Sequence, residues 1–426
     1  MPAVFLCRPT VEGAPAPAAA QPVALLQLDA GQPADAASAV YREFRRGRRV
    51  VAVASGGATA LGSLVTALAA IGVVATRPGH GETLLSDDVA LLAGPDVATD
   101  GPAAGPFRPL RIALAGCGVV GGGVLQRLLA DPRFEVVGVL VRDPGKRRDV
   151  VVPKGLVQLD PAALLAREPD VLVEAISDPS TGRALICAAL TRGVAVVSAS
   201  KQALSGDLAT LAGLARTSGV PLLYSASVGG GSPLIETVRR ARDHGAVVRI
   251  EAVLNGTCNF ILNRLADGVT FDAALDAARV AGFAEEDPSA DLTGLDAAAK
   301  LSILAHEALG QGPTVDSIPR DTLAADAVLP AGRVRQIASL DLRAGTADIA
   351  FRAVEGDGLF ADLPDEWNAL RVETADGRVF TTRGRGAGRL PTTEAVWADL
   401  NDLLAVWPYQ RGCNGHTDTD PLILRL

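Results

Sequence analysis

The chain has 426 residues, of which 48% are hydrophobic and only 4% aromatic, and it carries a formal net charge of -8. This length allows two or three domains with full cores, and a composition rich in small aliphatic residues and glycine favours an α/β fold over an aromatic-rich sandwich. The negative charge argues against a nucleic-acid partner, because phosphate binding needs clustered basic residues, and the one such cluster is short: Arg42, Arg45, Arg46, Arg48 and Arg49.

Residues 1–93 are interpreted as a small N-terminal α/β unit. Its first residues lack the basic stretch and apolar core of a signal peptide, and the five cysteines of the chain are far apart without a CxxC pair. These features predict a cytoplasmic protein without disulfides or a zinc site. The uncharged stretch 50–76 is long enough to span a bilayer. Four glycines interrupt it as strand, turn and helix would, so we expect no membrane association: Gly56, Gly57, Gly62 and Gly72.

Residues 94–109 are rich in glycine, proline and alanine and are predicted to be a linker. Residues 110–240 then alternate apolar strands with helices, which is the pattern of a Rossmann-type doubly wound parallel sheet. Because every motif described below follows the linker, we expect residues 1–105 to be removable without opening a core.

A glycine turn follows the first strand of this dinucleotide-binding domain. Gly116, Gly118 and Gly121 form a GxGxxG pattern between an apolar strand and an apolar helix, whose first residues are Val119 and Val120. Glycines let the backbone approach a pyrophosphate, and a helix N-terminus attracts its charge. The pattern in this context predicts a dinucleotide site.

The residues after the second strand indicate which dinucleotide binds. Where an Asp or Glu would hold the ribose of NAD, the sequence has Arg142 and Asp143, followed by three basic residues, Lys146, Arg147 and Arg148. Arg142 and one of these basic residues could hold the 2′-phosphate of NADP, which favours NADP. Asp143 could instead bind the ribose of NAD, so NAD stays possible.

Residues 241–382 are predicted to form a second α+β domain with an antiparallel or mixed sheet, because their strands include a hairpin signal at Asp376-Gly377. Residues 383–426 contain a late helix that we expect to return to the dinucleotide-binding domain. That return would bring Gly386, in the sequence GRGAG, beside the first glycine turn.

The segment GFAEEDPSADLTGLDAAAK, residues 282–300, places acids on a proline-containing loop before a helix. Asp296 and Lys300 lie one turn apart on that helix. Such a pair is usually a surface ion pair, but here its neighbours are apolar and leave little polar helix face. The pattern indicates a functional acid and amine.

This segment closely resembles the signature of the homoserine dehydrogenase family. Further stretches resemble the same family in the same order, and together they span Arg111 to Leu400: the GxGxxG unit, SASK ending in Lys201, SVGGGSPLI, NGTCNFIL and GRGAGRLPTTEAVWADL. The resemblance implies reversible NAD(P)H-dependent reduction of L-aspartate 4-semialdehyde to L-homoserine, in threonine, methionine and isoleucine biosynthesis. It also implies a homodimer formed through the second domain.

The resemblance assigns roles to individual residues. Lys300 and Lys201 carry the proton transfer, and Asp296 orients the reacting end of the substrate. The substrate pocket would consist of Glu285 and Asp291, which hold the amino group, with Thr257 and Gly256. The nicotinamide would be flanked by Ile176, Ser177, Ser198 and Lys201. A cationic amine beside the aldehyde stabilises the developing alkoxide and supplies a proton, which agrees with this assignment.

The chain departs from the family at three places. Members usually have a Glu before the VGGG stretch that helps bind a monovalent cation, and Ser225 stands there. A sodium or potassium site is therefore doubtful, although the carbonyls of Val228, Gly230 and Ser232 could still contribute. The regulatory domain of many members has no room after residue 426, so we expect no feedback inhibition through it. The N-terminal unit resembles an aspartate kinase fragment without the phosphate loop, so we expect no kinase activity.

Two other functions stay open. The first is an aldehyde-oxidising semialdehyde dehydrogenase with Cys258 as nucleophile, although Cys258 has no neighbouring His in the sequence. The second is a non-catalytic regulatory homologue. Both lysines and the acids of the signature are present, which argues against it.

Overall fold

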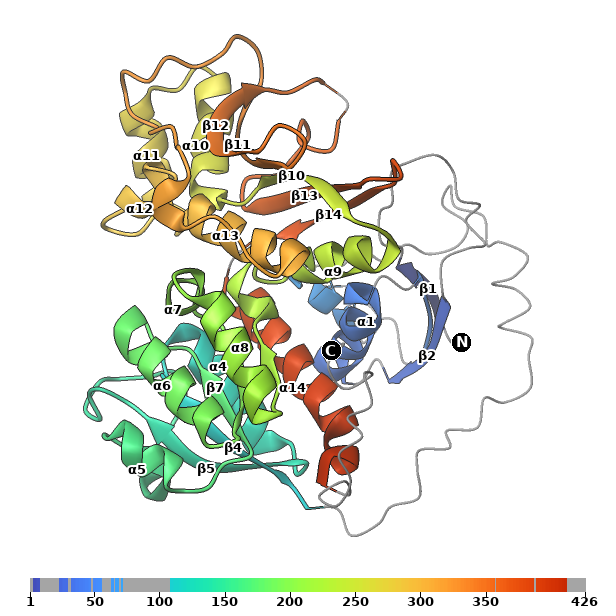
Figure 1. Cartoon of the computed structure of the whole chain (residues 1–426), viewed down its shortest axis with the longest axis vertical. Coiled ribbons are helices and arrows are strands. Elements are labelled where there is room, and N and C mark those ends of the chain that lie inside the picture. Colours follow the sequence, from blue (N-terminus) through green and yellow to red (C-terminus); the bar gives the residue numbers. More distant parts are fainter. Residues whose placement is uncertain are drawn as a thin grey trace.

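The computed structural model describes residues 3–7, 23–29, 32–46, 49–55, 63–64, 66–68, 70–71 and 108–411, except 357 and 387. The predicted linker, apart from residues 108 and 109, and the chain after 411 lie outside the described residues. Two large bodies stack one above the other, and a small N-terminal layer lies beside their junction (Figure 1).

The first body is a six-stranded parallel sheet in the order β6-β5-β4-β7-β8-β9. In chain order this is 3-2-1-4-5-6, the order of a Rossmann fold, so the predicted fold class is confirmed. Its strands are β4 (Leu110–Ala115), β5 (Phe134–Leu140), β6 (Val157–Gln158), β7 (Val171–Glu174), β8 (Ala195–Ser198) and β9 (Leu222–Leu223). Its helices are α4 (Val119–Ala130), α5 (Pro161–Leu165), α6 (Pro179–Thr191), α7 (Lys201–Ser205) and α8 (Leu208–Ser218), with the 3₁₀ turn η2 (Lys154–Leu156).

Local sequence explains these elements. The central strands β7 and β8 are buried along their whole length, as expected of strands covered on both faces. Asp160 and Asp178 each precede a proline and begin a helix, and their carboxylates accept backbone N–H groups of the first turn.

The second body is an antiparallel five-stranded sheet in the order β12-β11-β10-β13-β14. Its strands are β10 (Val247–Val253), β11 (Val334–Asp341), β12 (Thr346–Ala353), β13 (Trp367–Thr374) and β14 (Val379–Arg385). Its helices are α9 (Leu234–His244), α10 (Gly256–Ala266), α11 (Phe271–Val280), α12 (Ser289–Leu292) and α13 (Leu295–Leu309), with the 3₁₀ turns η3 (Ser225–Ser227) and η4 (Val315–Ser317). Gly377, with φ +80°, makes the turn of the expected hairpin.

Two domain boundaries expected from the sequence fall inside elements. A boundary at 240 cuts α9, which packs on α13 and on β13 and β14 and so belongs with the second sheet. A boundary at 382 cuts β14. Helix α14 (Arg389–Arg411) then packs on α4, where a Cβ added at Gly123 would meet Thr393 Oγ1 at 2.5 Å. The last helix thus lies on the nucleotide-binding domain.

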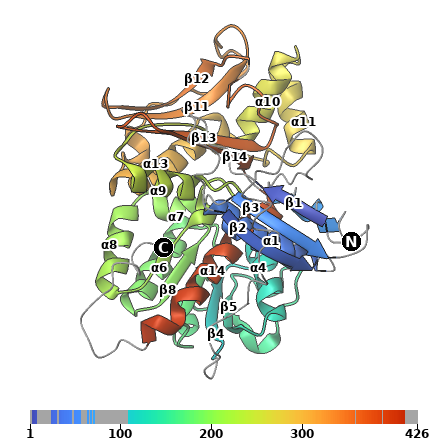
Figure 2. The same ribbon diagram turned by 90° about the vertical axis from the view of Figure 1, so that its right-hand side faces the viewer.

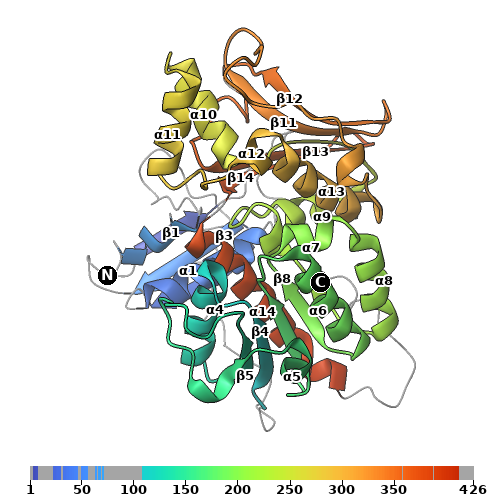
Figure 3. The same cartoon turned by 90° about the vertical axis from the view of Figure 1, so that its left-hand side faces the viewer.

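The N-terminal layer contains β1 (Ala3–Cys7), β2 (Val23–Asp29), α1 (Pro33–Arg45) and β3 (Arg49–Ser55). Strand β3 pairs antiparallel with β1 and parallel with β2. Figures 2 and 3 show α1 against α14. Val40 and Tyr41 share a buried apolar cluster with Ala398 of α14. The expectation that residues 1–105 can be removed without opening a core is therefore wrong, because the core continues from α1 into α14.

In the part of the chain that the structure describes, no helix combines the length and the apolar character needed to cross a membrane.

Candidate active site

Lys201 and Lys300 meet at one carboxylate. Lys201 begins α7 in the first body, and Lys300 lies on α13 in the second. The Nζ atom of Lys201 lies 2.9 Å from Asp296 Oδ1, and that of Lys300 lies 2.7 Å from Asp296 Oδ2. Lys300 also donates to the carbonyl of Leu254 at 2.7 Å. Residues 99 positions apart in the sequence are therefore close enough to act on one substrate.

Burial distinguishes this group from a surface ion pair. The side chains of Asp296 and Lys300 are 7% and 12% exposed, and that of Lys201 is 32% exposed. Burial alone would raise the pKa of Asp296, but the charges of Lys300 and Lys201 outweigh it and hold that pKa well below its usual range. The charge of Asp296 in turn raises the pKa of Lys201 despite burial. Asp296 is thus a carboxylate and Lys201 an ammonium at neutral pH.

A second carboxylate lies beside the first. Asn255 Nδ2 donates to Asp291 Oδ1 at 2.6 Å and to Asp296 Oδ2 at 2.9 Å, so one amide joins the two acids. The hydroxyl of Thr257 lies 3.1 Å from Asp291 Oδ2 and 2.6 Å from the carbonyl of Phe283. Burial, followed by the charge of Asp296, raises the pKa of Asp291. An added cation next to Asp291 would relieve that repulsion.

Asn255 was not identified from the sequence. Its Oδ1 accepts the N–H of Cys258 at 2.8 Å and so caps α10, whose first residue is Gly256. An Asn directly before a helix was the available signal. Glu285 is exposed on the loop before α12, and its charge is a minor contribution to the raised pKa of Lys201, after Asp296 and Asp291.

Cys258 does not suit the role of a nucleophile. It is completely buried, and burial followed by the charge of Asp291 raises the pKa of its thiol well above the usual value. Nucleophilic cysteines have lowered pKa values, because the thiolate is the reactive form. This argues against the aldehyde-oxidising alternative.

The glycine turn between β4 and α4 fits a dinucleotide. Gly116 has φ +93°, and a Cβ there would lie 2.3 Å from the carbonyl oxygen of Ala175. A Cβ at Gly121 would lie 2.0 Å from the carbonyl oxygen of Gly116, whereas one at Gly118 meets nothing within 4 Å. The outer two glycines are therefore needed by the fold, and the middle one leaves open space at the helix start.

The first turn of α4 borders that space. Val119 begins the helix and is 66% exposed, and the amides of Val119, Val120 and Gly121 have no acceptors within the helix. Unpaired amides at a helix N-terminus suit the phosphates of a dinucleotide. The described residues thus fit the cofactor that the sequence predicts.

Glu174 organises the adjacent strand ends and was not identified from the sequence. It is buried at the end of β7, accepts the hydroxyl of Ser198 at 2.6 Å and accepts the N–H of Ile176 at 2.8 Å. Burial raises the pKa of its carboxyl. Ser177 is exposed beside Ile176. The signal for Glu174 was an acid that ends an otherwise apolar strand, VLVE.

Arg142 and Asp143 differ in their availability. Arg142 is exposed directly after β5 and Val141. Asp143 Oδ1 accepts the N–H of Gly145 at 2.8 Å, and its carbonyl accepts Arg148 Nη2 at 2.6 Å. Both side chains are thus exposed, but one carboxylate oxygen of Asp143 is engaged in its own turn.

Gly386 follows β14 and contacts the second sheet. Its N–H donates to Glu366 O at 2.9 Å, and a Cβ there would meet the Asn368 side chain at 2.3 Å. Helix α14 begins three residues later and packs on α4. A role for Gly386 beside the cofactor stays a prediction.

The position of Ser225 offers no acidic ligand to a monovalent cation, and binding of such a cation by the carbonyls of Val228, Gly230 and Ser232 stays a prediction. The Ser225 hydroxyl accepts Arg45 Nη2 at 3.2 Å, so a guanidinium already occupies the position where the resemblance implies an acidic ligand. Ser232 donates to the carbonyl of Arg385 at 3.2 Å. Gly230, with φ +55°, and Val228 form an ordinary buried glycine turn.

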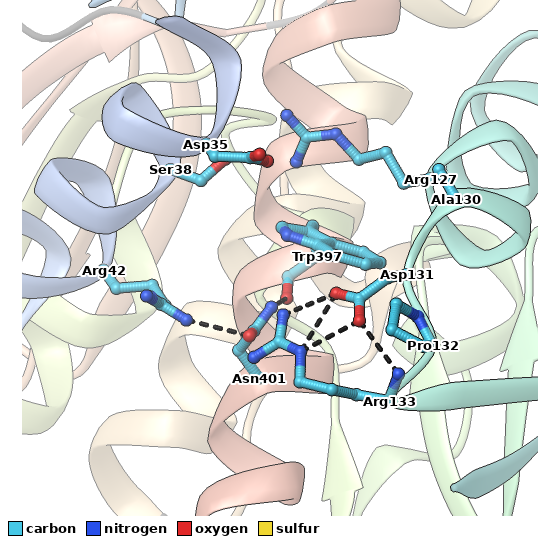
Figure 4. A pocket seen from close by; sticks show the side chains of 10 residues that line it. All are labelled: Asp35, Ser38, Arg42, Arg127, Ala130, Asp131, Pro132, Arg133, Trp397 and Asn401. Atoms are coloured by element: carbon cyan, nitrogen blue, oxygen red, sulfur yellow. Dashed lines mark hydrogen bonds and ion pairs between the residues drawn. The ribbon is translucent and has the colours of Figure 1, made fainter. Parts of the chain in front are cut away.

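A cavity of about 330 Å³ lies elsewhere, between α1, α4 and α14 (Figure 4). It is lined by arginines, acids and an aromatic ring, among them Arg42, Arg127, Asp131, Arg133 and Trp397. None of the lysines or acids described above lines it, so it is separate from the candidate active site.

Comparisons with known proteins agree with this geometry. The family profile described as homoserine dehydrogenase matches residues 233–401, and that described as the homoserine dehydrogenase NAD binding domain matches residues 116–225. A homoserine dehydrogenase of Synechocystis sp. is 32% identical over 70% of this chain and 74% of its own, and one of Corynebacterium glutamicum is 32% identical over 70% and 73%.

Solved structures give the same result. A homoserine dehydrogenase of Thiobacillus denitrificans aligns with TM-score 0.63 and 27% identity, covering 72% of this chain and 76% of its own. A hyperthermophilic archaeal homoserine dehydrogenase in complex with NADPH aligns with TM-score 0.61 and 25% identity, covering 69% and 97%. The chain therefore belongs to the homoserine dehydrogenase family of NAD(P)-dependent oxidoreductases.

Proposed function

We propose that the chain reduces L-aspartate 4-semialdehyde to L-homoserine, reversibly, with NADPH as the preferred cofactor. The observation that carries this proposal is the convergence of Lys201 and Lys300 on buried Asp296, with Asp291 alongside. Two ammonium groups next to carboxylates suit a substrate that has both a reacting oxygen and an amino group.

The proton comes from the lysines. When bound, a reduced nicotinamide would supply the hydride, and negative charge would then develop on the aldehyde oxygen as its π bond to carbon breaks. Lys201 has one partner among the described residues, so two of its N–H groups remain for that oxygen. Because an alkoxide is more basic than an amine, an ammonium both stabilises it and transfers a proton to it. Asp296 holds both ammoniums at that place.

The acids bind the other end of the substrate. Burial and the charge of Asp296 raise the pKa of Asp291, because its negative charge is not fully balanced. A substrate ammonium bound there would balance that charge. Glu285 is exposed at the mouth of the same site and adds a second negative charge. Thr257 and Asn255 fix the Asp291 carboxylate through hydrogen bonds. This arrangement selects aldehydes that carry an amino group.

Two observations support NADP over NAD. The Arg142 guanidinium is exposed after β5, and Asp143 is engaged with Gly145. The archaeal homoserine dehydrogenase aligned above was solved with NADPH. We further propose that the chain works in the cytoplasm as a homodimer, in the biosynthesis of threonine, methionine and isoleucine.

The test is NADPH oxidation with aspartate 4-semialdehyde, compared with NADH and with a four-carbon aldehyde that lacks the amino group. We expect turnover with the semialdehyde, a kcat/KM for the plain aldehyde lower by about 10²-fold or more, and a preference for NADPH that Arg142→Ala reduces about tenfold. Light scattering measures the oligomeric state. Cofactor binding without turnover would support the non-catalytic alternative.

A further inference from the structure

Arg45 of the N-terminal layer is a buried cation bound to three carboxylates. It lies at the end of α1 and is 3% exposed. Its Nη2 atom lies 2.7 Å from Asp399, 3.1 Å from Glu236 and 3.3 Å from Asp402, and it donates to the hydroxyl of Ser225 at 3.2 Å. One guanidinium thus joins α1 to α9, α14 and η3.

The acids cannot remain charged there without a cation. Asp399 has no exposed side-chain surface, and burial keeps its pKa raised even beside Arg45. Asp399 also accepts the backbone N–H of Ser225 at 3.1 Å, so it is committed to the fold of η3. Buried carboxylates without a counter-charge are strongly unfavourable. Among the described residues, Arg46 also makes an ion pair with this cluster: it is 38% exposed, and it pairs with Asp402 and with Glu43 outside the cluster.

The cluster lies where the two bodies join. Ser225 leads into the glycine turn and then into α9, which packs on α13, the helix of Asp296 and Lys300. Helix α14, which carries Asp399, packs on α4, the helix that follows the dinucleotide turn. A second contact reinforces the first, since a Cβ added at Gly231 would lie 3.1 Å from the carbonyl oxygen of Ile71. The N-terminal layer therefore holds the cofactor helix and the catalytic helix through one acid cluster.

We propose that Arg45 is the resident cation of this junction and replaces an alkali ion there, so that the N-terminal layer is a positioning part of the enzyme and catalysis is independent of Na⁺ and K⁺. The difference between this chain and the family at Ser225 supports the proposal. The resemblance implies a ligand for a cation from solution at this position, and here the position receives the guanidinium of Arg45 from the same chain. The inference rests on the proposed function for its kinetic readout only.

The experiment compares the full-length protein with Arg45→Met, Arg45→Lys and the matched control Arg46→Met, which removes a charge one position away at an exposed site. Melting temperature and kcat/KM are measured in NaCl, KCl and choline chloride at equal ionic strength. We expect the wild type to be equal in all three salts. Arg45→Met should melt lower by roughly 10 °C and lose about 10-fold to 100-fold in kcat, whereas Arg46→Met should change little.

Chemical rescue provides the decisive arm. In Arg45→Ala, guanidinium chloride at low millimolar concentration should raise the melting temperature and restore part of kcat, while tetramethylammonium chloride should not. If Arg45→Met is insoluble, the wild-type salt series and Arg45→Lys, which keeps the charge, still test the proposal. Activation of the wild type by Na⁺ or K⁺ over choline, or an Arg45→Met variant as stable and active as Arg46→Met, would overturn it. If the wild type does not turn over the semialdehyde, the proposed function fails, and the melting data still decide the role of Arg45.

Discussion

Replacing Lys300 and Lys201 by Met, singly and together, tests whether the two ammoniums serve one transition state. Methionine keeps most of the stem and removes the charge, so the surrounding packing should survive. Both ammoniums lie within 3 Å of Asp296. Each single change should therefore remove alkoxide stabilisation and proton transfer together, with a loss of about 10² to 10⁴ in kcat.

The stability costs should differ between the two lysines. Lys300 is 12% exposed and donates to both Asp296 and Leu254 O, so Lys300→Met leaves a carbonyl without its donor and costs about 1 to 3 kcal/mol. Lys201 is 32% exposed with one partner, so Lys201→Met should cost below about 1 kcal/mol. Lys201→Met thus separates the catalytic from the structural effect.

The assay is NADPH absorbance with aspartate 4-semialdehyde, together with urea unfolding of each variant. Lys154→Met, at an exposed lysine of η2, is the matched control and should retain kcat and stability. The double variant should lose less than the product of the single losses, because both act at one step. Near-normal kcat in either single variant, or fully multiplicative losses, would refute the shared site.

Two further predictions follow from the geometry. Gly121→Ala should prevent stable folding of the cofactor turn, because its Cβ would lie 2.0 Å from a backbone oxygen. Gly118→Ala should keep the wild-type melting temperature and raise only the KM for NADPH, because a Cβ there meets nothing within 4 Å. An equal effect of the two variants on the melting temperature would contradict this. The depressed pKa of Asp296, set by its two lysines against burial, stabilises the fold above the unfolded value of about 3.9 and is lost as pH falls below it. The melting temperatures of wild type and Asp296→Asn should therefore differ by a constant amount between about pH 5 and 8 and converge only below about pH 4.

The sequence pointed to the Rossmann sheet and to the two candidate catalytic lysines for different reasons. The sheet follows from local alternation of apolar strands with helices, which needs no knowledge of distant contacts. The roles of the lysines came from the resemblance, because the apolar neighbours of Asp296 and Lys300 argued against a surface pair but did not say what the pair does. Only the tertiary structure shows that Lys201 completes the group.

Residues that act through other residues were harder to find. Asn255 joins two carboxylates through one amide, and Glu174 accepts hydrogen bonds from Ser198 and Ile176. Neither was singled out in the sequence, because the neighbouring residues of their segments were given the functional roles. Arg45 was seen only as part of a basic cluster. Its side-chain partners, from Ser225 to Asp402, lie 180 to 357 positions further along the chain. No local sequence pattern could therefore have contained them.

The two charge clusters of this molecule use opposite arrangements for related purposes. At the candidate active site one carboxylate holds two ammoniums, so the lysines keep N–H donors for a substrate. At the junction the Nη2 atom of one guanidinium lies near three carboxylates, and none of the four side chains is more than 11% exposed. A partly exposed cluster with spare donors suits chemistry, and a buried cluster held by one arginine suits fixed geometry. The difference in burial between Lys201, 32% exposed, and Arg45, 4% exposed, therefore agrees with the roles proposed for them, reaction for Lys201 and positioning for Arg45.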